Sequence, residues 1–325
     1  MSDGPKIVLL GGGTGSFTLL QGLKRLTPNL TAIVNMSDDG GSTGVLRDEL
    51  GVLPPGDVRQ CLVALSDTPE VRDLFGYRFA HGRFRGQSLG NIILSGLELQ
   101  YGNFEEAIRI ASELLDVQGK VVPVTLQKHT LMLRDGLRTV RGQGRITTYT
   151  IKHPNPRLWL KPQAAINPAA KRAIREADLV VVAPGNFYGS ILPLCAVDGV
   201  ATVVRRTAAQ VVYVTNLVNR PGQAKGWHVA DYVQRLEDSL GAGTIDTVLY
   251  NTQHISDDLL QKYAAEDEFP VRTDAAAFAG IRAKTIGLSL VAKTVALQDP
   301  ADTAIRRTLI RHDADRVCAA LRQLL

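Results

Sequence analysis

The spacing of apolar residues changes twice near the start of the chain. Residues 7–10 form a continuous apolar run, residues 17–26 carry apolar side chains at helical spacing, and residues 30–36 are again mostly apolar. A continuous run predicts a buried strand, and helical spacing predicts an amphipathic helix. The order of strand, glycine turn, helix and strand is typical of the βαβ unit that opens a doubly wound sheet.

The middle of the chain changes from a helical to a β-type pattern. Residues 57–115 are largely helical, and Asn103 is placed to cap the last helix of this stretch. Short β-type runs follow at 121–124, 130–133 and 146–151. Asp135-Gly136 is a hairpin signal between two of these runs. We therefore expect an antiparallel insertion at about 120–160.

Alternation of helix and strand resumes in the second half. The expected elements are helices at 168–176 and 228–240 and strands at 179–183, 211–214 and 247–250. Residues 302–325 predict a terminal helix. The fold class is therefore α/β, with a doubly wound, mostly parallel sheet. Because no repeat or Pro-rich linker marks a boundary, we expect one domain over residues 1–325.

Composition narrows the class of protein without naming a function. The 325 residues are 45% hydrophobic and 21% charged, as in an ordinary globular protein. Cys61, Cys195 and Cys318 stand singly, so they predict neither a disulfide framework nor a metal motif. No apolar run approaches the roughly 20 residues that span a bilayer. We expect a cytoplasmic protein without membrane insertion.

Charge favours an anionic ligand. The net charge of +5 suits an anionic small molecule as well as it suits nucleic acid. The aromatic content of 6%, without interleaving of aromatic and basic residues, argues against a nucleic-acid surface, so we expect no nucleic-acid partner. The six histidines have no metal-ligand spacing, and no Ser-His-Asp or Cys-His set is indicated. Any chemistry would be phosphoryl-type transfer by positioning and electrostatics.

The first glycine turn is a candidate phosphate site. Gly12, Gly13, Thr14 and Gly15 follow a buried strand and open a helix, whose first N–H groups can bind an anion. The dinucleotide pattern GxGxxG fails at Ser16, and the Lys-Ser/Thr pair of a P-loop is missing. A plain tight turn between strand and helix stays open as an alternative.

Acidic residues follow the second strand. Asp38 and Asp39 stand where a doubly wound nucleotide fold places the acid that binds ribose hydroxyls. They could equally hold a divalent cation together with phosphate oxygens. An acidic turn that caps a helix is the third interpretation. Asp57, in the rigid turn 54–59, is either a helix cap or a ligand of the same metal.

Further polar residues stand at the starts of helices or the ends of strands. Ser88 and Asn91 open a helix and can donate to a bound oxygen, and Arg78, Arg83 and Arg85 lie upstream. A capped helix beside a solvated basic loop explains the same residues. Residues 184–190 form a second turn after a buried strand, and Asn216 ends the next strand at the same edge, where ligands bind in such sheets.

These motifs, in order, resemble the YvcK and CofD-like superfamily. The resemblance is carried by GGGTG at 11–15, NMSDDGGSTGVLR at 35–47, PPGDVR at 54–59, SLGN at 88–91, APG at 183–185 with Tyr188, and Asn216-Leu217. The DDGGS and PPGDVR sequences are similar to the YvcK branch, the gluconeogenesis factor type. The CofD branch transfers a phospholactyl-type group from a guanosine diphosphate carrier to a deazaflavin.

The resemblance implies a Rossmann-like three-layer fold and a nucleotide-sugar ligand. The implied ligand is a uridine diphosphate sugar, UDP-N-acetylglucosamine, bound by a cytoplasmic regulator of envelope precursor supply, cell shape and gluconeogenic growth. It also implies a regulated enzyme partner, and we expect a homo-oligomer. The residues that this hypothesis assigns to the ligand are Gly12, Gly13, Thr14, Gly15, Asp38, Asp39, Ser88, Asn91, Gly185, Tyr188 and Asn216.

Two enzyme hypotheses stand beside the regulator. In a CofD-like transferase, Asp38, Asp39 and Asp57 would organise a divalent cation that acts with the nucleotide. An NAD-dependent oxidoreductase is suggested by the glycine turn and the acid after the second strand. The absent third glycine of the fingerprint disfavours the oxidoreductase.

Overall fold

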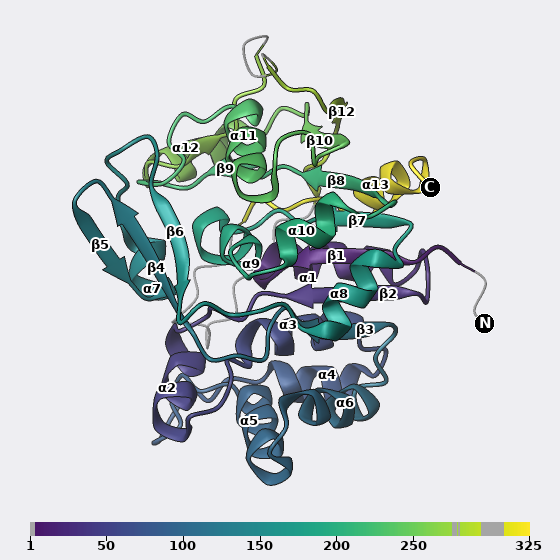
Figure 1. Ribbon diagram of the computed structural model, residues 1–325, viewed down its shortest axis with the longest axis vertical. Coiled ribbons are helices and arrows are strands. Elements are labelled where there is room, and N and C mark those ends of the chain that lie inside the picture. Colours follow the sequence, from purple (N-terminus) through teal and green to yellow (C-terminus); the bar gives the residue numbers. More distant parts are fainter. Residues whose placement is uncertain (1–3, 275–277, 279, 294–308) are drawn as a thin grey trace.

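A seven-stranded parallel sheet forms the centre of the computed structural model, which describes residues 4–274, 278, 280–293 and 309–325 (Figure 1). Its strands, in spatial order, are β12 (Lys284–Leu288), β10 (Thr247–Asn251), β8 (Gln210–Val214), β7 (Leu179–Val182), β1 (Ile7–Gly11), β2 (Leu30–Val34) and β3 (Lys120–Pro123). The expected α/β class with a doubly wound parallel sheet is confirmed.

The strand order reverses at β1. Strands β2 and β3 lie on one side of β1, and the later strands β7, β8, β10 and β12 lie on the other side. Ile7 pairs with Leu30 of β2 on one side and with Leu179 of β7 on the other. Strands β1 and β7 are apolar and buried along their whole length, because helices cover both faces of a parallel sheet. The loops after β1 and β7 therefore leave the sheet side by side in opposite directions, which opens a crevice between them.

Helices cover the two faces of the sheet. On one face α1 (Gly13–Leu23) packs against α3 (Gly56–Leu65) and α13 (Ala314–Arg322). Crossovers in the opposite direction put helices on the other face, since right-handed connections are strongly preferred. These are α8 (Pro168–Arg175), α9 (Leu192–Cys195), α10 (Val200–Arg205) and α11 (Val229–Leu240), of which α8 and α10 lie in front of the sheet in Figure 1.

Four further helices extend the molecule beyond the β3 edge, at the bottom of Figure 1. They are α2 (Gly41–Leu50), α4 (Pro69–Gly76), α5 (Leu89–Tyr101) and α6 (Phe104–Leu114). Asn103 caps α6 as predicted, because its side-chain oxygen accepts a hydrogen bond from the Glu105 N–H at 2.8 Å. In the part of the chain that the structure describes, no helix is long and apolar enough to cross a membrane.

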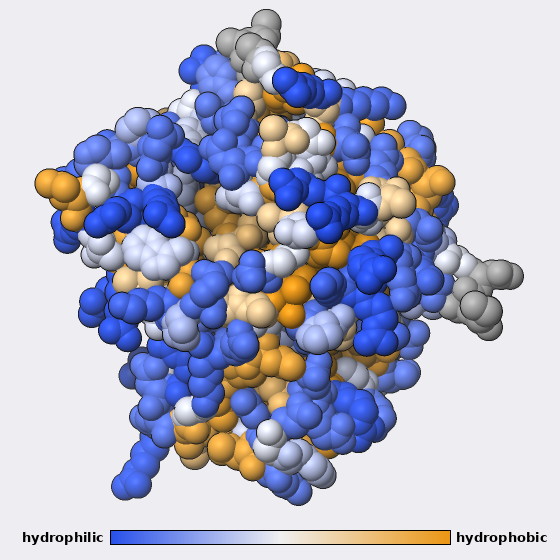
Figure 2. Space-filling model, viewed as in Figure 1, coloured by the Kyte–Doolittle hydropathy of each residue, from blue (hydrophilic) through white to orange (hydrophobic). Residues whose placement is uncertain are grey.

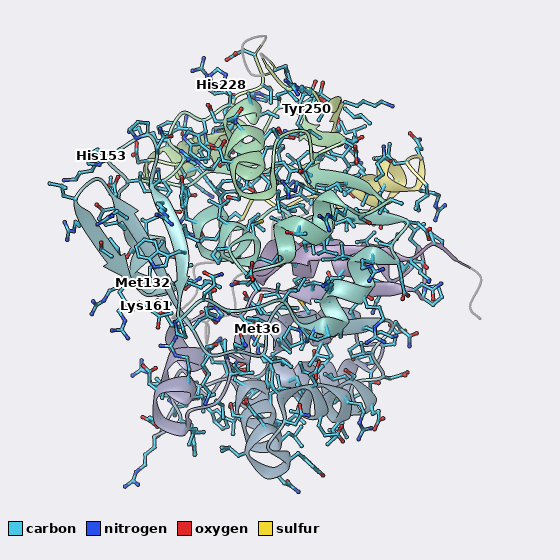
Figure 3. All side chains as sticks on the ribbon, viewed as in Figure 1. Met36, Met132, His153, Lys161, His228 and Tyr250 are labelled. Atoms are coloured by element: carbon cyan, nitrogen blue, oxygen red, sulfur yellow. The ribbon has the colours of Figure 1, made fainter. Side chains whose placement is uncertain are left out.

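A small antiparallel sheet lies to one side of the main sheet. It contains β4 (Thr130–Asp135), β5 (Arg138–Arg141) and β6 (Arg157–Lys161), in the order β5, β4, β6. The expected hairpin is present, with Gly136 at φ +60° in its turn. Figure 3 labels Met132 and Lys161 on this sheet and His153 in the segment before β6.

Two β-type runs within 120–160 behave differently from the prediction. The run at 121–124 does not join the antiparallel insertion: it forms β3, which pairs in parallel with β2 and buries Val121 there. Residues 146–151 are not a strand either, since α7 (Gln143–Thr148) covers the first half of them and residues 149–151 belong to no helix or strand. The N–H groups at the start of α7 find a carboxylate acceptor on Asp39, over a hundred residues earlier in the chain.

The remaining elements lie beyond β8 and near the C-terminus. Strands β9 (Val218–Asn219) and β11 (Phe269–Pro270) pair with each other, and α12 (Asp257–Ala264) precedes β11. A π-helical turn, η1 (Phe187–Ile191), follows β7. Of the expected terminal helix, residues 302–308 lie outside the described residues, and the helix begins only at Ala314.

Candidate functional site

A cavity of about 360 Å³ opens at the carboxyl edge of the sheet, between the loops that follow β1 and β7. It lies at the reversal of strand order, where open α/β sheets bind their ligands. Its volume falls within the range of about 300–1,000 Å³ that is usual for small-molecule sites. The crevice expected from the two glycine turns is therefore present.

The first glycine turn forms one wall of the cavity. Gly12, Gly13, Thr14 and Gly15 all line it, so the structure brings these four predicted residues together. Gly13 has φ +68°, and a Cβ atom on Gly15 would lie 1.9 Å from the carbonyl oxygen of Pro184. The start of α1 thus touches the second turn directly. Its N-terminal end faces the cavity and favours an anion there.

The second turn is locked to the end of β8 by a reciprocal pair of hydrogen bonds. The Gly185 N–H donates to Asn216 Oδ1 at 3.2 Å, and Asn216 Nδ2 donates to the Gly185 carbonyl at 2.8 Å. Both residues line the cavity, as predicted for this edge. Because Asn216 uses its amide on the backbone, it holds the shape of the turn beside the ligand space.

Asp38 and Asp57 form an acidic pair in the lining. Burial, together with the charge of Asp38, raises the pKa of Asp57 to about 7, against hydrogen bonds from Asn35 and the Gly13 N–H. Burial also raises the pKa of Asp38, while hydrogen bonds from the Gly40 N–H and the Thr43 side chain lower it. Asp57 is not the helix cap that one interpretation expected, since α3 begins at Gly56 and Asp57 lies in its first turn.

Asp39 does not line this cavity. Its two carboxylate oxygens accept from the Gln143 N–H at 2.9 Å and from the Gly144 N–H at 2.6 Å, at the start of α7. Arg47 lies 3.8 Å from the same carboxylate. Asp39 therefore caps a helix, but the helix belongs to the small antiparallel region and not to its own turn. The two adjacent aspartates have separate roles.

Ser88 and Asn91 lie behind α2 and not along the cavity. Asn91 Oδ1 accepts from Arg59 Nε at 2.9 Å, and Asn91 Nδ2 donates to Ser42 Oγ at 3.3 Å. The Ser88 hydroxyl is buried without a hydrogen-bond partner among the described residues. Both residues position the start of α2. The first turn of α2 contains Thr43, which lies beside Asp38.

Tyr188 is buried in an aromatic cluster on the far side of the second turn. Its ring lies 5.9 Å from Phe187 and 6.3 Å from Trp227. Burial raises the pKa of the Tyr188 hydroxyl to about 12, and Arg235 opposes this shift. Other residues of the same turn, among them Gly185, Phe187 and Ser190, line the cavity, and Tyr188 does not. Tyr188 thus supports the turn from behind.

The residues on the cavity wall opposite the first glycine turn were not predicted from the sequence. Arg220, Glu268, Arg311 and His312 also line the cavity. The cavity walls desolvate Arg220 and lower its pKa, which the nearby Glu268 carboxylate opposes. Burial lowers the pKa of His312 to about 4, and its Nε2 lies 2.9 Å from the Thr215 carbonyl, so the ring is neutral near pH 7. No local pattern marks these residues, because they come from loops and the segment before α13.

The hypothesis of a divalent cation site depends on Asp38 and Asp57, the two aspartates that line the cavity. The described residues contain no group of three or more His, Cys, Asp or Glu side chains that could hold a metal ion. Asp38 and Asp57 could supply carboxylate oxygens from one part of the cavity lining, and oxygen ligands suit Mg²⁺. A cation here would need further oxygens from the ligand, since Asp39 is engaged at α7.

Known proteins resemble this chain over nearly its whole length. The family described as 2-phospho-L-lactate transferase CofD matches residues 7–292. The chain belongs to the CofD family. The gluconeogenesis factor of Bacillus subtilis is 38% identical over 331 residues, covering 100% of this chain and 99% of the relative. The gluconeogenesis factor of Listeria innocua is 37% identical over 326 residues, covering 99% and 96%.

A solved structure of the same family has the same fold. The crystal structure of a UPF0052 family protein from Bacillus halodurans matches with a TM-score of 0.90 and 34% identity, covering 99% of this chain and 100% of that one. The resemblance to the YvcK and CofD-like superfamily is thereby confirmed over nearly the whole chain. The gluconeogenesis factor name belongs to several of these relatives.

Proposed function

We propose that this CofD family protein binds a nucleoside diphosphate sugar, UDP-N-acetylglucosamine, and acts as a regulator. The observation that carries the proposal is the cavity at the strand reversal, where the N-terminus of α1 and the guanidinium of Arg220 face one ligand space. Both features favour a doubly charged diphosphate. The names of the relatives support a role in the control of gluconeogenic growth.

The parts of the ligand can be assigned to parts of the lining. We assign the diphosphate to Gly12–Gly15 and to the arginines of the opposite wall, Arg220 and Arg311. Asp38 and Asp57 then take the hydroxyl groups of ribose or sugar, or a divalent cation bound to the diphosphate. Gly185 and Asn216 shape the remaining wall. The other predicted site residues act indirectly in this assignment. Ser88 and Asn91 act through α2, Asp39 acts through α7, and Tyr188 acts through the second turn.

The wider role follows the family resemblance. We place the protein in the cytoplasm, as a single-domain homo-oligomer whose ligand state controls an enzyme partner in envelope precursor supply and cell shape. No membrane insertion or nucleic-acid partner is part of this proposal. Control by ligand requires different affinities for the ligand in the free and partner-bound states.

A CofD-like transferase is the second candidate. It is favoured by the paired carboxylates of Asp38 and Asp57, because burial and the charge of Asp38 raise the pKa of Asp57 and a bound cation would relieve the repulsion between the two. The family description names such a transferase. In this case Asp38 and Asp57 would hold the cation, which would neutralise charge on the transferred phosphate group.

One experiment separates the two candidates. Thermal unfolding and titration calorimetry are run with UDP-N-acetylglucosamine, UDP, GDP and ADP, each with and without Mg²⁺. We expect stabilisation by the uridine ligands and no consumption of the sugar nucleotide over hours. A shift with GDP alone contradicts the uridine assignment. Metal-dependent turnover of any nucleoside diphosphate donor contradicts the purely regulatory role.

A further inference from the structure

The segment between α4 and α5 alternates aromatic and basic residues. Tyr77-Arg78-Phe79 and Arg83-Phe84-Arg85 repeat the same alternation, so the expectation that aromatic and basic residues do not interleave is wrong for this segment. We call residues 77–87 the aromatic–basic loop. Its arginines stand just before Ser88 and Asn91 in the sequence, but none of them lines the cavity between β1 and β7. The loop therefore has a separate surface of its own.

The loop has a defined shape. The Phe79 N–H donates to the Gln87 carbonyl at 3.0 Å, and the Gly86 N–H donates to the Phe79 carbonyl at 2.8 Å. Arg78 donates to the Gly86 carbonyl at 2.6 Å. The ring of Phe79 packs 5.2 Å from Tyr77 and 5.4 Å from Phe84. A surface that is already ordered loses little conformational entropy when it binds.

The outer face of the loop presents apolar and cationic groups together. Tyr77 is 51% exposed, Phe84 is 56% exposed, and Leu74 at the end of α4 is 49% exposed. Arg83 and Arg85 are also exposed, and within the described chain neither has an ion pair or a side-chain hydrogen bond. Figure 2 shows apolar patches among hydrophilic residues toward the lower end of the molecule, where Figure 1 places α2 and α5.

We propose that the aromatic–basic loop is a docking surface for an acidic segment of a protein partner that also carries apolar side chains. Aromatic residues and arginine are enriched at the centres of protein interfaces. The unpaired guanidinium groups of Arg83 and Arg85 can each receive a carboxylate in a bidentate pair. Apolar side chains of the segment would then cover the exposed rings of Tyr77 and Phe84.

Other occupants fit the charges less well. Two unpaired arginines give few of the phosphate contacts on which nucleic-acid binding depends. A two-fold contact centred on Arg83 and Arg85 would bring the same arginines of both chains together.

The base of the loop is joined to the start of α2. Ser42 Oγ donates to Gln87 Oε1 at 2.7 Å, and the Ser88 N–H donates to Ser42 Oγ at 3.1 Å. Thr43, the next residue, hydrogen-bonds to Asp38 in the cavity. The docking surface is therefore distinct from the cavity but rests on the same helix. The proposed docking does not depend on whether the cavity binds a nucleotide.

The test uses fluorescence anisotropy with three labelled probes. The probes are a peptide of repeated Glu-Leu-Glu-Phe units, the same peptide with lysine in place of glutamate, and a short oligouridylate. We expect the full-length protein to bind the acidic peptide. Phe84→Ala and the double variant Arg83→Glu/Arg85→Glu should each raise its Kd by about tenfold or more. The matched control Arg157→Glu/Lys161→Glu makes the same charge change at exposed positions on β6 and should leave the Kd unchanged.

Several outcomes would overturn the proposal. They are equal loss of binding in the β6 control, binding of oligouridylate that is lost in the loop variants, and absence of binding by the acidic peptide. A change of sedimentation coefficient in the loop variants, with no effect on the peptide, would assign the face to a second copy instead. Thermal unfolding of each variant checks the fold, since the substituted side chains are exposed. Nucleotide binding, measured separately, tests the proposed function without reference to this surface.

Discussion

The carboxylate of Asp38 raises the pKa of Asp57 where both line the cavity, in addition to the larger effect of burial. Asp57 follows the second strand by many residues and comes from α3, whereas Asp38 precedes α2. The two residues therefore form a buried acidic pair that only the fold assembles. Ionisation of this pair should make the free energy of unfolding depend on pH.

The ligand-free protein should lose stability as the pH rises toward 8. The pKa of Asp57 is about 7 in the folded protein and 3.8 in its ordinary state, so the folded state binds the proton more tightly. Stability is then greatest below pH 3.8 as far as this group is concerned, and it falls as the pH rises through about 7. Asp57→Asn should reduce the loss between pH 5 and pH 8 by about 1–3 kcal/mol, as measured by urea unfolding.

Asp73→Asn is the control for this titration, because Asp73 is exposed on α4. It should leave the pH dependence as in the natural protein. An unchanged pH profile in Asp57→Asn would show that Asp57 does not carry the effect.

Gly15→Ala should destabilise the protein and abolish ligand binding. Its Cβ atom would lie 1.9 Å from the Pro184 carbonyl oxygen, so the two turns must separate. Such overpacking costs about 1–3 kcal/mol. Gly96→Ala in α5 is the matched control, since a Cβ atom there meets nothing within 4 Å. It should raise stability by about 0.5–1 kcal/mol. Equal effects of both substitutions in urea unfolding would contradict the close contact.

Asp39→Ala should loosen α7 without removing a cavity side chain. The substitution deletes both acceptors of the Gln143 and Gly144 N–H groups, and loss of such a cap costs about 0.5–2 kcal/mol. Hydrogen exchange should become faster within 143–148, while exchange in α6 stays as it was. If exchange in α7 is unchanged and ligand affinity falls sharply, Asp39 contacts the ligand as first predicted.

Arg220→Ala should weaken binding of UDP-N-acetylglucosamine. A hydrogen bond to a charged group contributes about 1.5–3 kcal/mol, which corresponds to an increase of about tenfold to a hundredfold in Kd. Unfolding should change little, because the guanidinium makes no hydrogen bond or ion pair among the described residues. Arg157→Ala on β6 removes an exposed arginine elsewhere and serves as the calorimetry control. Equal Kd values for the two variants would remove Arg220 from the site.

The errors of the sequence prediction have a common physical cause. The run at 121–124 is apolar enough for either sheet, and only its position beside β2 makes it part of the parallel sheet. Residues 146–151 have β propensity, yet the Asp39 carboxylate offers acceptors that favour helix at 143–148. In both cases a distant partner overrides local preference, as is usual for short segments.

The sequence by itself determined the alternating elements, the cap at Asn103, and the two glycine turns that meet at the cavity, because these depend on periodicity and on backbone conformations that few residues adopt. Tertiary structure alone decided which polar residues share that cavity. It separated Asp39 from Asp38 and brought Arg220 and His312 to the opposite wall. The carboxyl ends of parallel strands converge from remote parts of the chain, and no local spacing records that convergence.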